Sequence, residues 1–325
     1  MIQQIKKNWF YLIIVLIALL VPVFVPNRYF FQIIIMSCLF AIGALSLNLI
    51  LGYTGQASLA HGGFFGIGAY GVAIMTQTLG WPFWIALPLA ALLAAVLGLI
   101  VGIPALRTRG AYFAIATMCL GEIIVLVAGN WVELTGGHNG IVGINPPNAI
   151  PIPFIGEINF ASQTAQYYLV LIFLLFTLFI MHRLVYSLKG LTFMAVRNNE
   201  LLAEAVGINT FRTKLLSFVV ANFLVGMAGG IYASLIGSIS PSVASIVKTF
   251  DFLLYVLLGG IATLAGPILG GFALPILMEY LQFLQDYQMI FFGVMLVVVI
   301  IYAPRGLMGA ITTLRNKFNR KKVGA

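Results

Sequence analysis

Charged side chains are scarce in this sequence, and a soluble fold needs many of them. Only 8% of the 325 residues are Asp, Glu, Lys or Arg, while 62% are hydrophobic and the mean hydropathy is +1.08. A soluble globular chain is typically about 25% charged and about 45–50% apolar. A water-soluble fold is therefore excluded, and most of the surface of this protein is expected to face hydrocarbon.

Cysteine and histidine are scarce as well. Cys38 and Cys119 both lie inside apolar stretches, so neither a disulfide framework nor a thiolate metal site is expected. His61, His138 and His182 are too few and too scattered for a metal cluster. No Lys follows a Gly, so the chain lacks the lysine of a Walker A phosphate-binding loop. The sequence thus predicts no metal, no cofactor and no nucleotide site in this chain.

Long apolar runs fill the chain instead. A transmembrane helix needs roughly 20 mostly apolar residues, and about ten such segments are predicted, with nine or eleven as alternatives. They lie near residues 9–25, 30–51, 62–79, 83–106, 111–129, 165–182, 214–237, 250–266, 268–284 and 288–303. The last three are crowded and interrupted by Gly and Pro, so half-helices are expected among them. The predicted fold is an all-α polytopic transmembrane helix bundle, a single domain over residues 1–325 with broken helices.

Basic residues fall almost entirely on one side of these predicted spans. If the N-terminus is cytoplasmic, all 17 Lys and Arg residues except Arg28 and Lys248 lie in cytoplasmic segments. By the positive-inside rule, both termini are therefore predicted in the cytoplasm, with an outer loop at about 130–166 and a cytoplasmic loop at about 186–213. The net charge of +9 then reflects topology, with anionic lipid rather than nucleic acid as the counter-charge.

Glycine is abundant and concentrated in two dense stretches. The first begins at Gly52 and the second covers 259–267, and they lie at comparable places in the two halves of the chain. Interrupted segments in paired positions indicate internal repeats and a pathway near the membrane midplane. The first stretch is Gly52-Tyr53-Thr54-Gly55-Gln56-Ala57-Ser58. Glycines four residues apart also predict close helix packing, at Gly62/Gly66, Gly98/Gly102, Gly226/Gly230 and Gly266/Gly270.

One carboxylate lies deep in a predicted span. Glu122 is about midway along 111–129, where a carboxylate costs on the order of 2.5–3.5 kcal/mol to insert. Such a group either forms hydrogen bonds with neighbouring helices or lines a translocation route. Asp251 and Glu279 lie nearer the ends of their spans and are expected at the membrane interface. These three carboxylates also permit a proton relay.

The predicted outer loop contains neither Lys nor Arg. Residues Ile150 to Phe160 alternate loosely around Gly156-Glu157, as a short hairpin would. An ordered outer cap and a plain connecting loop both fit this pattern.

A short amphipathic helix is predicted in the cytoplasmic loop. Asn199 is a suitable N-cap and Gly207 a suitable C′ residue. Glu200 and Glu204 lie one turn apart near the positive end of the helix dipole. The helix can dock in the groove of a partner or rest on lipid headgroups. Its apolar face consists of Leu201, Leu202, Ala205 and Val206.

Three stretches of the chain resemble ABC importer permeases of the branched-chain amino acid family, the LivM-type subunit. They are Gly52 to Tyr70, Gly110 to Ile123 with Leu134-Thr135-Gly136-Gly137 after it, and Arg197 to Asn209. The stretches occur in family order, and the likeness covers most of the chain, from about Phe30 to Met308.

The resemblance implies a non-catalytic, multi-pass subunit in the bacterial cytoplasmic membrane. Its partners would be a homologous second permease, two cytoplasmic ATPases that bind ATP and Mg, and an extracytoplasmic solute-binding protein. Because Glu204-Ala205-Val206-Gly207 matches the E-A-x-G core of the coupling loop, the resemblance assigns ATPase coupling to Arg197, Glu200, Leu201, Glu204, Ala205 and Gly207. The residues expected along the route are Gly52, Tyr53, Thr54, Gly55, Gln56, Ser58 and Glu122.

The expected function is ATP-driven import of branched-chain amino acids by alternating access. Related permeases carry urea or short amides, which makes those substrates the first alternative. A second alternative is a proton-coupled amino-acid carrier that uses Glu122. A membrane-embedded enzyme is disfavoured because no nucleophile–base pair is visible in the sequence.

Overall fold

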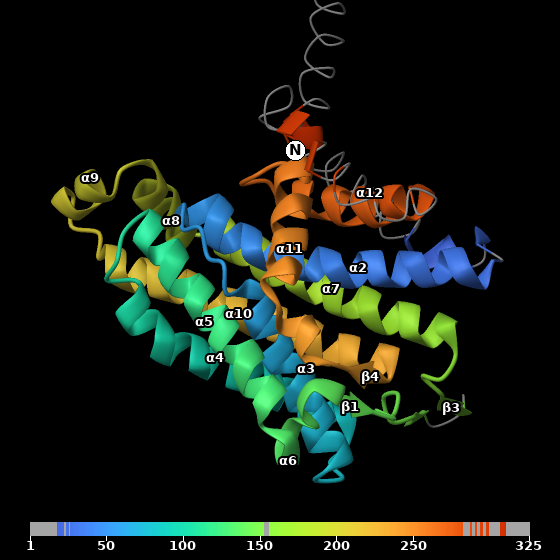
Figure 1. Cartoon of the computed structure of the whole chain (residues 1–325). Coiled ribbons are helices and arrows are strands. Elements are labelled where there is room, and N and C mark those ends of the chain that lie inside the picture. The colour runs from blue at the N-terminus through green and yellow to red at the C-terminus, as the bar shows by residue number, and fades with distance from the viewer. Residues whose placement is uncertain are drawn as a thin grey trace, which may run out of the picture.

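The chain forms a bundle of helices in which short strands occupy one end. The computed structural model describes residues 18–22, 24–25, 27–152 and 156–281, together with residues 287, 290, 293–294, 297–298 and 306–309. In Figure 1, the small helices α8 and α9 lie at one end of the bundle and the strands at the other. The loops that the sequence assigns to opposite sides of the membrane therefore lie at opposite ends of the bundle.

Most of the long helices coincide with predicted spans. Five described helices are long and apolar enough to cross a membrane, namely α2 with its π-helical extension η1, α4, α5, α7 and α10. The all-α polytopic fold is confirmed, whereas the number of spans and the location of the termini stay predictions. The segments 9–25 and 288–303 lie largely outside the described residues. The principal helices are α2 (Arg28–Asn48), η1 (Leu49–Tyr53), α3 (His61–Gln77), α4 (Phe83–Ala105), α5 (Ala111–Asn130), α7 (Gln163–Val185), α8 (Leu188–Asn198), α9 (Glu200–Ala205), α10 (Thr210–Ile236), α11 (Ile246–Gly259) and α12 (Gly266–Tyr280).

Glycine pairs bring the helices of the core close together, as predicted. A side chain on Gly68 of α3 would collide with the backbone of Gly226 in α10, so only glycine permits this approach. Gly98 of α4 lies against Asn222 of α10, and Gly270 of α12 lies against the backbone of α11. In lipid, where water does not drive helices together, such close van der Waals contact holds the bundle.

Two helices begin inside the bundle rather than at its ends. α3 starts at His61, whose ring Nε2 lies 3.2 Å from the carbonyl oxygen of Gly43, well within α2. α11 has only 14 residues, and its first turn lies beside the start of α3. The N–H of Gly62 donates there to Thr249 Oγ1 at 2.8 Å. The half-helices expected near the C-terminal end are therefore present, and α3 begins inside the bundle in the same way.

The predicted span 250–266 is wrong in its bounds. α11 begins earlier, at Ile246, and ends at Gly259 because Gly260 adopts a φ of 124° that only glycine tolerates well. A turn follows, and α12 begins at Gly266 with Pro267 in its first turn, a position where the missing N–H costs nothing.

The strand end of the bundle is an ordered cap. β1 (Ile141–Val142) pairs antiparallel with β4 (Ser238–Ile239), which ties the loop after α5 to the end of α10. β2 (Ile150–Ile152) pairs with β3 (Gly156–Ile158) and confirms the predicted hairpin. Gly156 pairs with Ile152, however, so it lies in the second strand and not at the turn as expected. The remaining elements here are α6 (Val132–Thr135), η2 (Gly137–Asn139) and η3 (Pro241–Ala244).

Candidate functional site

The predicted amphipathic helix is α9, and its ends lie as the sequence indicates. The side chain of Asn199 accepts a hydrogen bond from the N–H of Leu202 at 3.0 Å, which caps the first turn. Gly207 follows the last turn with a φ of 87°, a conformation that favours glycine. The preceding helix α8 was not anticipated, and it places Arg197 in its last turn.

One face of α9 is apolar and uncovered by the described chain. Leu201, Leu202 and Val206 are 66%, 63% and 69% exposed, and Ala205 is exposed beside them. Ala203 points the other way and is buried. The predicted apolar face is confirmed, and it is available to a partner or to lipid.

The opposite face of α9 is held to the bundle by charged groups. Lys214 of α10 is 2% exposed, and its Nζ lies 2.5 Å from Glu200 Oε1. Thr210 Oγ1 donates to Glu204 Oε1 at 2.7 Å. Arg109, from the loop before α5, lies 3.8 Å from Glu200 and 3.9 Å from Glu204. Sequence reasoning missed Lys214 as a functional candidate, although a lysine at the start of an apolar helix is a signal that a partner exists.

The first glycine-rich stretch forms a break between two helices. Tyr53 ends η1, residues 55–60 form neither a helix nor a strand, and α3 starts at His61. Thr54 and Ser58 are buried, and Thr54 Oγ1 donates to the carbonyl of Ile50 at 2.6 Å. The predicted broken helix is confirmed here.

This break contacts helix α8. A Cβ on Gly55 would lie 3.1 Å from Arg197 Cγ, so the backbone of the break rests on α8. Ser217 Oγ lies 3.3 Å from Thr54 Oγ1 and donates to the carbonyl of Lys214 at 2.8 Å. A continuous set of contacts therefore runs from Glu200 through α10 to Thr54.

The two glycine-rich stretches meet in space. Asn48 Nδ2 donates to the carbonyl of Thr263 at 2.8 Å, and Asn48 Oδ1 accepts from the N–H of Ala262 at 2.9 Å. A Cβ on Gly52 would lie 2.8 Å from the nitrogen of Ala262. The breaks in the two halves of the chain are thus neighbours, joined by one buried asparagine.

Glu122 takes part in none of these contacts, but its neighbours on α5 pack against the break before α3. The neighbouring Gly121 packs near Ala60, and Thr117 Oγ1 accepts from the N–H of Leu59 at 3.0 Å. Glu122 itself is partly exposed, and within the described ranges it has no hydrogen-bond or ion-pair partner. The interpretation of Glu122 as a carboxylate bound to neighbouring helices thus has no support within the described chain.

The other acidic residues in the spans divide into two cases. Lys248 forms an ion pair with Asp251 at 3.6 Å, and its Nζ lies 4.0 Å from the ring centroid of Phe40, near the middle of the α2 span. The placement of Lys248 and Asp251 at the outer interface is therefore wrong, because they pack inside the bundle. Glu279 accepts a hydrogen bond from Tyr29 at the start of α2, which fits its expected place near a helix end.

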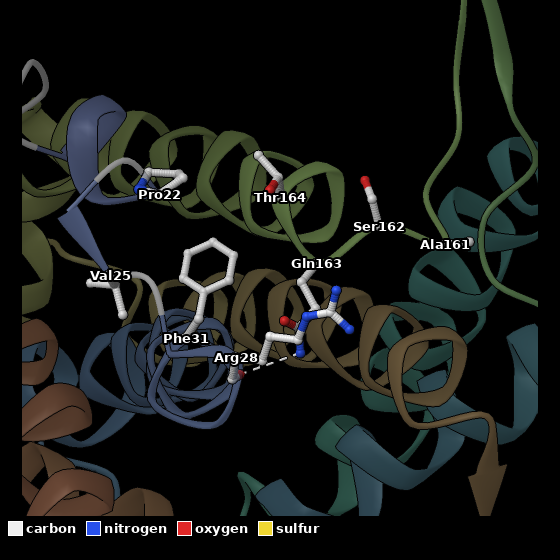
Figure 2. A pocket seen from close by; sticks show the side chains of 8 residues that line it. All are labelled: Pro22, Val25, Arg28, Phe31, Ala161, Ser162, Gln163 and Thr164. Atoms are coloured by element: carbon white, nitrogen blue, oxygen red, sulfur yellow. Dashed lines mark hydrogen bonds between the residues drawn. The ribbon is translucent and has the colours of Figure 1, made fainter.

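Two cavities lie away from the predicted route. One has a volume of 570 Å³. It lies between the start of α2, with Arg28 and Phe31, and the start of α7 (Figure 2). None of the predicted route residues lines it. An open hollow of 380 Å³ adjoins α9 and is lined by Glu204 and 207–211. This hollow lies at the C-terminal end of α9, and none of the apolar-face residues of the helix lines it.

Comparison with known proteins decides the family. Residues 29–300 match the family model described as branched-chain amino acid transport system / permease component. The chain belongs to this family. No solved structure matches the chain.

Several relatives are high-affinity branched-chain amino acid transport system permease proteins. LivM of Salmonella typhimurium strain LT2 and LivM of Escherichia coli K12 are each 30% identical to the chain, over 94% of it and 76% of each relative. LivH of Escherichia coli K12 is 26% identical over 83% of the chain and 91% of that protein. Permease homologues of two kinds therefore exist, and the resemblance seen in the sequence is confirmed, as is a multi-pass place in the bacterial cytoplasmic membrane.

Proposed function

We propose that this chain is the transmembrane permease subunit of an ATP-driven importer that moves branched-chain amino acids into the cell by alternating access. The observation that carries the proposal is α9, a short helix whose apolar face is free while Glu200 fixes it to the buried Lys214 of α10. Because one face of α9 is fixed to the bundle and the other is uncovered by the described chain, the helix suits docking into the groove of a partner. The branched-chain substrate follows the names of the relatives.

The proposed partners supply the nucleotide-binding site that this sequence lacks and complete the transporter. Two cytoplasmic ATPases, which carry ATP and Mg, would bind to α9 and to the hollow beside it. A homologous second permease would complete the route, and an extracytoplasmic binding protein would rest on the cap formed by β1 and β4. This chain itself would hydrolyse nothing and would bind membrane lipid but no nucleic acid.

The proposed route passes the helix break and Glu122. α3 and α11 both start within the bundle, so the positive ends of their helix dipoles are a suitable environment for the carboxylate of a zwitterion, although the Gly62 N–H already donates to Thr249. Glu122 suits its ammonium group. Tyr53, Thr54 and Ser58 are buried in this conformation, so opening of the route requires the break at 52–58 to move, together with Gly55 and Gln56. Arg197, against Gly55, would transmit that movement from α8.

The docking role is tested by charges on the apolar face of α9. Leu201→Asp and Leu202→Asp should abolish leucine uptake, because an aspartate cannot enter an apolar groove without losing its hydration. Leu188→Asp is the matched control, since Leu188 of α8 is 82% exposed and lies outside the docking face. Uptake of labelled leucine into cells that carry the complete transporter is the measurement. Normal uptake by both α9 variants would contradict docking.

The same cells distinguish the alternatives of substrate and energy source. We expect accumulation of leucine to require ATP and to be reduced by excess valine or isoleucine but not by urea. Uptake of urea in place of leucine would favour the amide alternative. Leucine accumulation driven by a pH gradient in ATP-depleted membrane vesicles would favour the proton-coupled carrier.

A further inference from the structure

Among the five described helices that are long and apolar enough to cross a membrane, α5 is the least covered. In the most apolar 18-residue stretch of α5, only 22% is buried by the described chain, compared with 78% for α2 and 67% for α10. The covered side is a single stripe along the helix that faces α3 and the break before it. Its members are Phe113, Thr117, Gly121, Ala128 and Gly129.

The uncovered side of α5 contains the carboxylate of Glu122. Met118 and Leu126, one turn before and after Glu122 on the same face, are 38% and 60% exposed. Ile115 is 56% exposed, and Cys119 is exposed. These five residues, Ile115, Met118, Cys119, Glu122 and Leu126, form the outward face of α5.

Lipid is a poor neighbour for this face. A carboxylate in the middle of a span is costly in hydrocarbon and therefore faces protein or water. The other poorly covered helices of the described chain, α4 and α7, contain no Asp or Glu. The open side of α7 presents Ile172, Phe176 and Phe179, 63%, 44% and 61% exposed, which hydrocarbon solvates well. Exposure alone therefore does not distinguish α5, but exposure combined with Glu122 does.

We propose that the outward face of α5 packs against a second permease chain of the same family, and that Glu122 lines the seam between the two. The proposal rests on the proposed function and names the surface that the second permease covers. Relatives named as permeases of one transport system occur in two kinds in one organism, which makes a homologous chain the fitting occupant. Because Gly121 lies at the break, the seam reaches the same depth as the start of α3.

The test is site-specific photo-cross-linking in native membranes. p-Benzoylphenylalanine replaces Leu126 or Ile115 on α5 and, as controls, Ile172 or Phe179 on α7. We expect both α5 positions to form an adduct that mass spectrometry identifies as this chain or a chain matching the same family. We expect no protein adduct at the α7 positions. Adducts with that chain at α7 but not α5, or lipid adducts alone at α5, would overturn the proposal.

A second measurement separates this proposal from the proposed function. ATP-dependent leucine uptake is recorded in the same membranes, with Glu122→Gln and Glu122→Leu alongside. We expect Glu122→Leu to lose uptake while the Leu126 adduct persists, because the contact is made by the apolar neighbours. ATP-driven uptake without an α5 adduct would reject the interface alone. An α5 adduct with uptake that needs no ATP would reject the importer and leave the interface standing.

Discussion

At the scale of single residues, the buried cation of Lys214 has the clearest physical consequence. Its partner Glu200 is 23% exposed, so water still reaches one member of the pair. Removing one member of a buried pair costs about 3–5 kcal/mol because the other charge is left unpaired. For this pair, roughly 2 kcal/mol is expected, since water can still reach Glu200. The effect on coupling should exceed the effect on folding, because the pair joins α9 to α10.

The ion pair predicts the outcome of a charge exchange. Lys214→Met should lose most leucine uptake while the protein still reaches the membrane, because α9 then keeps only the Thr210–Glu204 hydrogen bond to α10 within the described chain. Glu200→Lys combined with Lys214→Glu should recover part of that loss. Lys189→Met, in an exposed position on α8, should leave uptake unchanged. Uptake and thermal stability of the purified complex are the measurements, and full uptake by Lys214→Met would show that the pair is dispensable.

Two carboxylates outside that pair make a matched comparison. Glu122 lies within a span, whereas Glu157 is an exposed residue of the hairpin strand β3. Glu122→Leu should reduce uptake severely while the complex still assembles, because it removes a polar group from the seam and leaves the apolar contacts in place, whereas Glu157→Leu should have little effect. Initial rates of uptake, normalised to the amount of complex in the membrane, provide the comparison. Equal and negligible effects would make Glu122 a bystander.

At the scale of elements, α9 depends on how its two ends are built. Asn199 starts the helix through its cap, and Gly207 ends it with a positive φ. Between these residues the helix turns its charged side to α10 and its apolar side outward. Local signals thus decide that a helix forms, and packing decides which of its faces is free.

The end of α9 gives a graded prediction. Gly207→Pro should abolish uptake, because proline locks φ near −65° and cannot adopt the 87° found here. Gly207→Ala should be milder, since no atom lies within 4 Å of its Cβ and only the backbone strain of about 1–2 kcal/mol applies. Glu204→Lys should also lose uptake, because it places a cation beside Arg109. Stimulation of the ATPase by the permease is the second readout, and wild-type values in Gly207→Pro would contradict the coupling role.

At the scale of the whole molecule, two interrupted segments are brought together in one bundle. α10 packs against α3 and α4, while α2 packs against α11 and α12. Asn48 joins the turn between α11 and α12 to the end of α2. The breaks therefore share one set of contacts, and a shift of α8 and α9 at one end can reach both.

This arrangement predicts that the chain alone performs no work. Purified and reconstituted without other proteins, it should not accumulate leucine against a gradient under either ATP or a pH gradient. Addition of the ATPases, the second permease and the binding protein should restore uptake. Uphill transport by this chain alone would reject the importer.

Much of the local structure could be predicted from the order of residues. Hydropathy over about 20 residues places the spans, because each helix satisfies its own backbone within lipid. Asn199 and Gly207 bound α9 because capping depends only on neighbours in the chain. The glycine-rich stretch at 52–58 predicted a break because glycine weakens a helix locally, through the freedom of its own backbone.

Only the tertiary structure decided what these segments contact. Lys214 and Glu200 are on different helices, and Asn48 meets Thr263 across 215 positions of the chain. No local signal records such pairs, because they arise when helices pack side by side. The depth at which α3 and α11 start, the burial of Lys248 against Phe40 and the open face around Glu122 have the same origin. Sequence determined which segments enter the membrane, and packing determined which side chains meet there.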